Sequence, residues 1–203
     1  NIYTQLEDYK LLNKKNNIFK SNKEDITFEN KIEIKNLNFE FSQKNIIIKN
    51  LNMVIKKNSF VGIKGDSGSG KSTLLNILSG LIIPQSGSIL VDGKDISNNI
   101  ESLRKKIGYV SQSVFLLDSS IKNNIAFGVA ENEIDFFKLN SAIKKSGLES
   151  YIYSLDKKID TVVGERGLRI SGGQKQRIGL ARALYFSPEI LILDEATNSL
   201  DKK

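Results

Sequence analysis

The sequence contains no cysteine and no histidine among its 203 residues. Without thiols or imidazoles, a disulfide scaffold, thiol catalysis and the usual zinc sites are excluded. Any chemistry must therefore use carboxylates, Lys, Ser or Thr, or a hard cation held by oxygen atoms. No apolar run approaches the roughly 20 residues that a membrane helix needs, and no cleavable signal opens the sequence.

Acidic residues are in the minority, with 23 Asp and Glu against 30 Lys and Arg and a formal net charge of +7. A basic balance suits nucleic acid or an anionic lipid surface. The Lys residues, however, are interleaved with Asn and Ile and follow no regular aromatic spacing, and few of the cations are Arg. We therefore expect a solvated basic surface and no nucleic-acid partner.

Hydrophobic spacing divides the chain into segments of different structure. Residues 3–12 have helical spacing, and residues 13–25 are polar and without period, which predicts a short helix and a linker. Apolar residues then alternate through residues 32–55, as in a β-rich lobe. Residues 132–155 return to helical spacing and predict a helical insertion. The length fits one globular domain, and the mixture predicts an α/β fold.

A glycine-rich segment, GDSGSGKS at residues 65–72, matches the pattern of a phosphate-binding loop in full. It follows a predicted strand, Phe60–Ile63, and opens a predicted helix at 72–81 that ends near Gly80. In such a loop backbone N–H groups converge on phosphate oxygens, Lys71 reaches the β- and γ-phosphates, and the Ser72 hydroxyl binds Mg²⁺. The candidate nucleotide ligands are Gly65, Asp66, Ser67, Gly68, Ser69, Gly70, Lys71, Ser72 and Thr73.

Two acidic residues follow a run of four aliphatic residues, Ile190–Leu193. Such a run is typical of a parallel strand buried on both faces. Ligands bind beyond the carboxyl ends of these strands, so Asp194 is expected to meet Mg²⁺ and Glu195 to act as general base toward an attacking water. The alternative is that either acid only caps a following helix.

A second glycine-bearing turn, ISGGQ at residues 170–174, precedes an amphipathic helix. Its N-terminus is a second anion-binding position in the same chain. A monomer needs only one phosphate-binding turn for each nucleotide. The second turn therefore suggests that it contacts a nucleotide held mainly by another subunit.

With these motifs in this order, residues 30–201 resemble the nucleotide-binding domain of an ABC transporter, whose signature reads LSGGQ. The resemblance implies a P-loop NTPase core with a mostly parallel sheet, an N-terminal antiparallel β lobe and an inserted helical subdomain at about 113–180. It implies an ATPase that uses ATP and Mg²⁺, with Lys71, Gln112 and Glu195 as catalytic residues and Ser72, Gln112 and Asp194 at the metal.

The resemblance also assigns roles to single positions. Phe41 stands where the family has an aromatic residue, usually Tyr, that stacks on adenine. The signature residues Ser171, Gly172, Gly173 and Gln174 are expected to contact the nucleotide of a second nucleotide-binding domain, in a homodimer or a paired half. Asp201 falls in the loop that crosses this dimer interface. TVVGERG at 161–167 resembles a motif of exporters in which Glu165 and Arg166 contact the transmembrane domain.

One departure from the family concerns a histidine that contacts the γ-phosphate. It should follow Asp201 by about thirty residues, as the resemblance implies, yet the sequence stops at Lys203. We expect a domain at 30–203 whose C-terminal end is missing, and better ATP binding than turnover. Residues 1–29 resemble the end of a membrane-domain helix and its linker, or are an ordinary solvated tail; the first interpretation predicts the cytoplasmic face of a membrane.

Two other classes of protein share parts of this pattern. A soluble ABC-type ATPase acting on DNA or ribosomes would need a coiled-coil insertion or a second cassette. Neither is visible, but a truncated chain leaves the missing cassette open, so TVVGERG at 161–167 is the main feature that favours an exporter. A P-loop kinase or GTPase leaves the SGGQ turn unexplained, and no Asn-Lys-x-Asp guanine reader is present. The sequence therefore favours an ATP-driven exporter motor.

Overall fold

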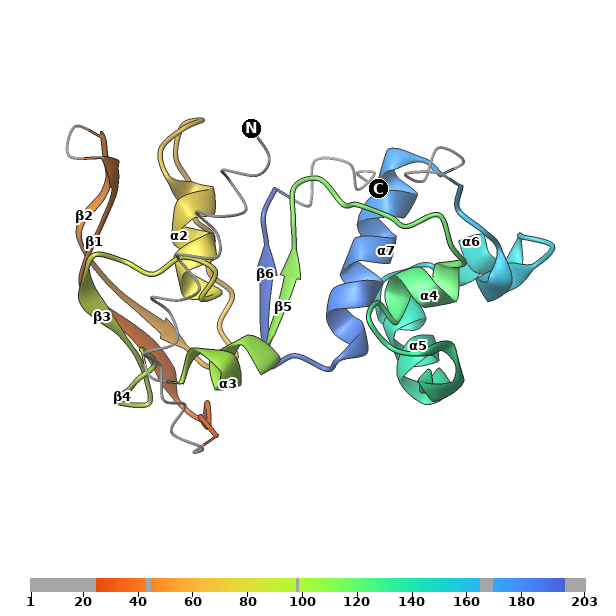
Figure 1. Cartoon of the computed structure of the whole chain (residues 1–203), viewed down its shortest axis with the longest axis horizontal. Coiled ribbons are helices and arrows are strands. Elements are labelled where there is room, and N and C mark those ends of the chain that lie inside the picture. Colours follow the sequence, from red (N-terminus) through yellow and green to blue (C-terminus); the bar gives the residue numbers. More distant parts are fainter. Residues whose placement is uncertain (1–24, 43–44, 98, 165–169, 196–203) are drawn as a thin grey trace, which may run out of the picture. The chain divides into compact units, whose positions relative to one another are not determined.

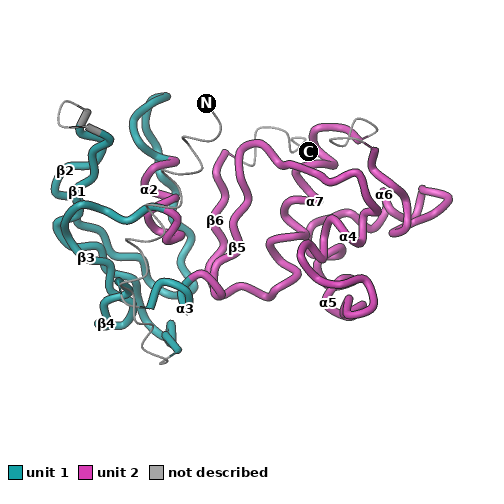
Figure 2. Tube along the Cα trace, viewed as in Figure 1, with its two compact units in different colours: residues 1–71, 82–103 teal, residues 72–81, 104–203 magenta. Residues whose placement is uncertain are grey.

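The computed structural model describes residues 25–42, 45–97, 99–164 and 170–195 (Figure 1). The chain divides into two compact units (Figure 2). The first comprises residues 1–71 and 82–103, and the second comprises residues 72–81 and 104–203. The helix expected at 3–12 lies outside the described residues, as does the linker expected at 13–25 except for its last residue.

The first unit is built on a four-stranded antiparallel sheet, which confirms the β-rich lobe expected from the alternating pattern. Its strands stand in the order β2-β1-β3-β4. A short helix, α3 (Ile100–Lys105), follows the sheet. The strands are β1 (Lys31–Ser42), β2 (Asn45–Lys56), β3 (Ser86–Val91) and β4 (Lys94–Asp95).

Two bulges explain why the alternation in β1 changes phase after Ile34. Asn36 has φ 48°, and the pairing shifts by one residue between Ile34 and Leu37. Asn50 in β2 has φ 46°, and the opposite shift there restores the register where Phe39 pairs with Ile48; two further shifts follow toward the turn. Asn tolerates the left-handed conformation better than most residues. One face of β1 therefore stays buried along its length, through Ile32, Ile34, Leu37 and Phe39.

Strand β3 passes unusually close to the first bulge. A Cβ atom on Gly87 would lie 2.6 Å from the carbonyl oxygen of Asn36 and 2.6 Å from the Cα atom of Leu37. The φ angle of Gly87 is also positive, at 90°. Only glycine satisfies both conditions, so this residue is what lets β3 pair with the bulged strand.

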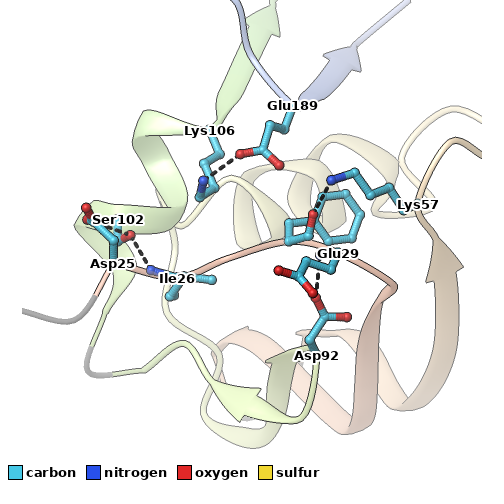
Figure 3. Close-up of polar contacts among 9 residues, drawn as sticks. Asp25, Ile26, Glu29, Lys57, Asp92, Ser102, Lys106 and Glu189 are labelled. Carbon is cyan, nitrogen blue, oxygen red and sulfur yellow. Dashed lines mark hydrogen bonds and ion pairs between the residues drawn. The ribbon is translucent and has the colours of Figure 1, made fainter.

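The segment leading into β1 is fastened by side chains at its flanks (Figure 3). The Asp92 carboxylate accepts hydrogen bonds from the backbone N–H groups of Glu29, Asn30 and Lys31. These bonds, with that of Glu29 first, lower the pKa of Asp92 below its usual value. Earlier in the segment, the Ile26 N–H donates to the Ser102 hydroxyl at 2.8 Å.

The second unit combines a parallel strand pair with several helices. Strand β5 (Ile107–Val110) pairs in parallel with β6 (Ile190–Leu193). Helix α2 (Lys71–Leu78) begins at the last residue of the first unit. The other helices are α4 (Ile121–Ile125), α5 (Phe136–Lys145), α6 (Glu149–Tyr153) and α7 (Gly172–Tyr185), with 3₁₀ turns η1 (Glu131–Glu133) and η2 (Lys158–Asp160).

The helices of the second unit enclose their own hydrophobic core. Leu116, Ile121, Ile125, Leu139 and Ile178 are all at most 1% exposed and belong to one cluster. The helical spacing predicted at 132–155 corresponds to α5 and α6, with apolar faces turned into this core.

A polar cluster joins α7 to α4 beside that core. The Arg182 guanidinium donates to the carbonyl oxygens of Asn124 and Phe115, at 2.8 and 2.9 Å. The Asn124 amide in turn bonds both the N–H and the carbonyl oxygen of Leu117, at 2.9 and 3.0 Å. Burial lowers the pKa of Arg182, and the acceptors offset that cost because they satisfy its donors.

Two local expectations differ from the structure. Phe60–Ile63 is not a strand, and Phe60 is 96% exposed. A strand forms only where a neighbour completes its hydrogen bonds, and no described strand pairs with these residues. In β6, Leu191 and Leu193 are exposed, so burial on both faces is not found. Among the described strands, β6 pairs with β5 alone, and α7 packs against β5.

Candidate functional site

The glycine-rich loop belongs to the first unit and curls around a lysine. The Lys71 ammonium donates to the carbonyl oxygens of Gly65 and Asp66, at 2.9 and 2.7 Å. Gly70 has φ 89°, and a Cβ atom there would lie 2.5 Å from Cγ2 of Ile47. The loop therefore needs glycine at this position to keep its backbone conformation. It presents a cation at its centre, as a phosphate-binding loop requires.

Other predicted ligands of this loop lie on its accessible side. Side chains that face solvent can approach a polyphosphate without further rearrangement of the core. Asp66, Ser67, Gly68 and Ser69 are exposed, whereas Thr73 on α2 is half-buried. Helix α2 ends at Leu78, and the predicted terminator Gly80 follows with a positive φ of 72°; its N–H bonds the Ile77 carbonyl while the Leu81 N–H bonds the Asn76 carbonyl.

Within the second unit, Ser72 and Asp194 come together although 122 positions separate them. The Ser72 hydroxyl donates to Oδ1 of Asp194 at 3.2 Å. Asp194 is 8% exposed, and its N–H extends the strand pairing by bonding the Val110 carbonyl at 2.9 Å. The strand β6 thus delivers a nearly buried carboxylate to the first turn of α2.

A second contact partner of Asp194 was not predicted from the sequence. The Tyr109 hydroxyl on β5 lies 3.2 Å from Oδ2 of Asp194 and 3.3 Å from Oδ1 of Asn76. Burial, followed by the negative charge of Asp194, raises the pKa of Tyr109 to about 12. The phenol is therefore protonated at neutral pH. The only signal in the sequence was its place three residues before Gln112.

Gln112 and Glu195, predicted as neighbours in function, are also neighbours in space. The Gln112 side-chain amide donates to Oε2 of Glu195 at 2.6 Å. Glu195 is exposed and has a positive φ of 49°. The Gln112 carbonyl accepts a hydrogen bond of 2.8 Å from the side chain of Gln176 on α7, a contact that sequence patterns did not reveal.

The SGGQ turn forms the N-terminus of α7. Ser171 is the N-cap: its hydroxyl oxygen accepts from the Gln174 N–H at 3.3 Å, and its own N–H donates to the Gln174 side chain at 3.0 Å. Gly172 and Gly173 are the first helical residues, and Ser171 and Gly172 are exposed. The helix start is accessible to an anion.

Of the other residues assigned by resemblance, the structure describes only Phe41. Phe41 is 65% exposed at the end of β1, and its ring meets that of Phe39 edge to face, with 5.0 Å between centroids. Its outer face is therefore available for stacking. Glu165, Arg166 and Asp201 lie outside the described residues.

The donor set fits a hard cation. Ser72, Asp194 and Gln112 all offer oxygen atoms, which is the chemistry that Mg²⁺ prefers. Among the described residues no group of three or more acidic or His side chains could hold a metal by itself. A magnesium ion bound through one or two protein oxygens and phosphate oxygens would need no such group. No helix within the described parts of the chain is long and apolar enough to cross a membrane.

Comparison with known proteins identifies the family. The profile of the family described as ABC transporter matches residues 48–198. The chain therefore belongs to the ABC transporter family.

Individual relatives support this family assignment. The chain is 45% identical over 172 residues to the alpha-hemolysin translocation ATP-binding protein HlyB of Escherichia coli O157:H7, which covers 84% of this chain and 24% of that protein. It is 41% identical over 180 residues to the ABC multidrug transporter atrD of Emericella nidulans, covering 87% of this chain and 13% of that protein.

A solved structure of a bacterial Atm1-family ABC exporter with ATP bound matches with a TM-score of 0.82 and 36% identity, over 89% of this chain and 32% of that chain. This match confirms the expected P-loop NTPase fold. The chain spans less than a third of the length of each of these proteins.

Proposed function

We propose that this chain is the ATP-binding and ATP-hydrolysing motor domain of an ABC exporter. The observation that carries the proposal is the meeting, within the second unit, of Ser72 with Asp194 and of Gln112 with Glu195. These pairs join the residue types that bind a metal to those that handle a water molecule. The names of the relatives favour export over a soluble ATPase that acts on DNA or ribosomes.

Each side chain has a defined task in this proposal. Lys71 exchanges its loop carbonyls for phosphate oxygens, and the exposed ring of Phe41 stacks on adenine. Ser72, Asp194 and Gln112 would hold Mg²⁺, which neutralises charge on the transferred phosphoryl group. Glu195 accepts the proton of the attacking water, and its bond to Gln112 holds the carboxylate in place.

The accessible start of α7 supports a two-copy arrangement. The signature turn of one copy, Ser171–Gln174, would contact the nucleotide bound to the loop of the other copy. Closure and reopening of the pair would drive transport through a transmembrane domain at the cytoplasmic face of a membrane. In this proposal residues 30–203 belong to the nucleotide-binding domain, and its helical subdomain spans about residues 113–180. Residues 1–29 connect it to the membrane domain.

The first test measures binding of a fluorescent ATP analogue to the chain. Lys71→Ala is expected to weaken binding by about 10- to 100-fold, the size of a lost hydrogen bond to a charged group. Lys145→Ala, which removes an exposed Lys from the last turn of α5, is the matched control and should bind normally. Equal affinity for all three proteins would contradict the assignment of the loop.

The second test concerns turnover in the intact transporter. Glu195→Gln should bind ATP as tightly as the unmodified protein and lose about 100-fold or more in hydrolysis, because a general base contributes 10²- to 10⁴-fold. The amide keeps the shape and removes only the proton acceptor. Undiminished hydrolysis by this variant would rule out Glu195 as the base.

A further inference from the structure

The two oxygen atoms of the Asp194 carboxylate have different partners in the second unit. Oδ1 accepts from the Ser72 hydroxyl, and Oδ2 lies 3.2 Å from the Tyr109 hydroxyl. The backbone of Asp194 is held as well, through its N–H bond to Val110. Rotation of the carboxylate about its terminal torsion is otherwise broad and roughly two-fold. The Tyr109 contact therefore restricts this rotation and holds the other oxygen toward Ser72.

The position of Tyr109 is itself fixed from two sides. It belongs to β5, where it stands opposite Ile192 of β6 in the parallel pairing. Its hydroxyl also lies 3.3 Å from the side-chain amide of Asn76 on α2. A phenol has one proton to donate and can accept at the same oxygen. In both contacts the Tyr109 hydroxyl is the donor, toward Oδ1 of Asn76 and Oδ2 of Asp194, and the charged carboxylate is the stronger acceptor for its one proton.

We propose that Tyr109 is a positioning residue for the magnesium site: its hydroxyl anchors Oδ2 of Asp194, so that Oδ1 stays beside Ser72 for the metal. The inference rests on the proposed function, in which Ser72 and Asp194 hold Mg²⁺. In this proposal Tyr109 acts on the metal only through Asp194. Partners that orient a metal ligand in this way commonly change metal affinity by 10- to 100-fold when they are removed.

A purely structural role for Tyr109 makes a different prediction. Loss of packing between β5 and α2 would disturb the first turn of α2, and nucleotide binding would weaken with or without the metal. Loss of the carboxylate anchor would affect only the step that depends on Mg²⁺. Nucleotide binding measured across a magnesium titration therefore separates the two roles without using hydrolysis.

The experiment compares Tyr109→Phe with the unmodified chain, using a fluorescent ATP analogue at increasing Mg²⁺ concentration and in excess EDTA. The half-saturating Mg²⁺ concentration is expected to rise about 10-fold, while the affinity in EDTA is unchanged. Tyr151→Phe is the matched control, because Tyr151 is a half-buried tyrosine on α6 of the same unit. It should leave both values unaltered.

Asn76→Leu keeps the inference testable should Tyr109→Phe disturb folding, and a double variant tests whether Tyr109 acts through Asp194. Asn76→Leu removes the competing acceptor of the Tyr109 proton, so the Mg²⁺ requirement should stay the same or fall, and a rise would oppose the inference. In an Asp194→Asn background, Tyr109→Phe should have no additional effect on the metal, since the two changes act through one group.

The outcomes that oppose the inference are distinct. An unchanged Mg²⁺ requirement in Tyr109→Phe, with normal ATP binding by the unmodified chain, overturns the positioning role and leaves the proposed function intact. An equal loss of affinity in EDTA and in Mg²⁺ also overturns it, in favour of packing. Failure of the unmodified chain to bind the analogue at all overturns the proposed function and this inference together.

Discussion

At the scale of single residues, the groups of the candidate site already have protein partners. Lys71 bonds two carbonyl oxygens of its own loop, and Asp194 bonds Ser72 and Tyr109. A ligand therefore exchanges existing hydrogen bonds for new ones, and the net gain per contact is smaller than the gross strength of a charged hydrogen bond. Magnesium would compete with the Ser72–Asp194 bond, while the Tyr109 contact lies on the opposite oxygen.

Gly87 offers a stability test at the same scale. Gly87→Ala combines a strained positive φ with a clash against the backbone of Asn36 and Leu37, so we expect a loss of about 3 kcal/mol in the free energy of unfolding. Gly93→Ala is the control, because Gly93 has a similar φ of 83° and open space around its Cβ position. It should lose only about 1 kcal/mol.

Urea denaturation followed by circular dichroism measures both variants. A loss in Gly87→Ala no greater than that in Gly93→Ala would show that the bulge of β1 can move away from β3. The close approach of β3 to the bulge would then make no measurable contribution to the free energy of unfolding.

At the scale of secondary structure, sequence patterns predicted those elements whose signals are local. Helix α2, with its glycine end, and the strand Ile190–Leu193 were both predicted, because spacing, composition and terminal residues agree there. Phe60–Ile63 was predicted as a strand and is not one. Its composition is apolar, but strand formation depends on a partner that no local pattern reveals.

The residues of the candidate site also divide into those that the sequence predicted and those that it missed. Matches to known motifs predicted Lys71, Ser72 and Asp194, because their residue types and spacing are diagnostic. Tyr109 and Gln176 were missed, since a hydrogen bond to another functional residue leaves no periodic trace in the sequence. Such contacts follow from how β5 and α7 pack, which only the folded structure supplies.

The N-terminus of α5 provides a test of one element. Asp135 caps this helix, its carboxylate accepting from the N–H groups of Phe137 and Lys138 at 2.9 and 3.1 Å. Asp135→Ala should lower the free energy of unfolding by about 1 kcal/mol, and Asp135→Asn should restore most of it, because Asn is as good a cap. Urea midpoints of the three proteins measure this. Equal losses in both variants would assign the effect to charge and not to capping.

At the scale of the whole molecule, the signature turn and the phosphate loop are proposed to serve one nucleotide only when two copies meet. The loop lies in the first unit and the turn in the second. Each copy would thus contribute one half to each of two sites. This arrangement links nucleotide binding to association, which is the property a motor domain needs.

Mixing two inactive variants tests this arrangement. Lys71→Ala disables the loop, and Ser171→Asp retains a helix cap but opposes a phosphate with negative charge. Each variant alone should hydrolyse little ATP. In an equal mixture of the two, half of the pairs carry one intact site of two, so about a quarter of the normal rate should return. No recovery on mixing, with pairing verified by sedimentation, would place both halves of a site in one copy.

The two asparagine bulges have a consequence for how this domain tolerates changes in length. Each extra residue, at Asn36 in β1 and at Asn50 in β2, cancels the offset made by the other. Deleting Asn36 alone would remove its bulge and return β1 to strict alternation, so Leu37 and Phe39 would stay on the buried face with Ile34. A deletion elsewhere in β1 would instead turn the side chains beyond it to the opposite face, so single-residue gaps should be inherited at the bulges.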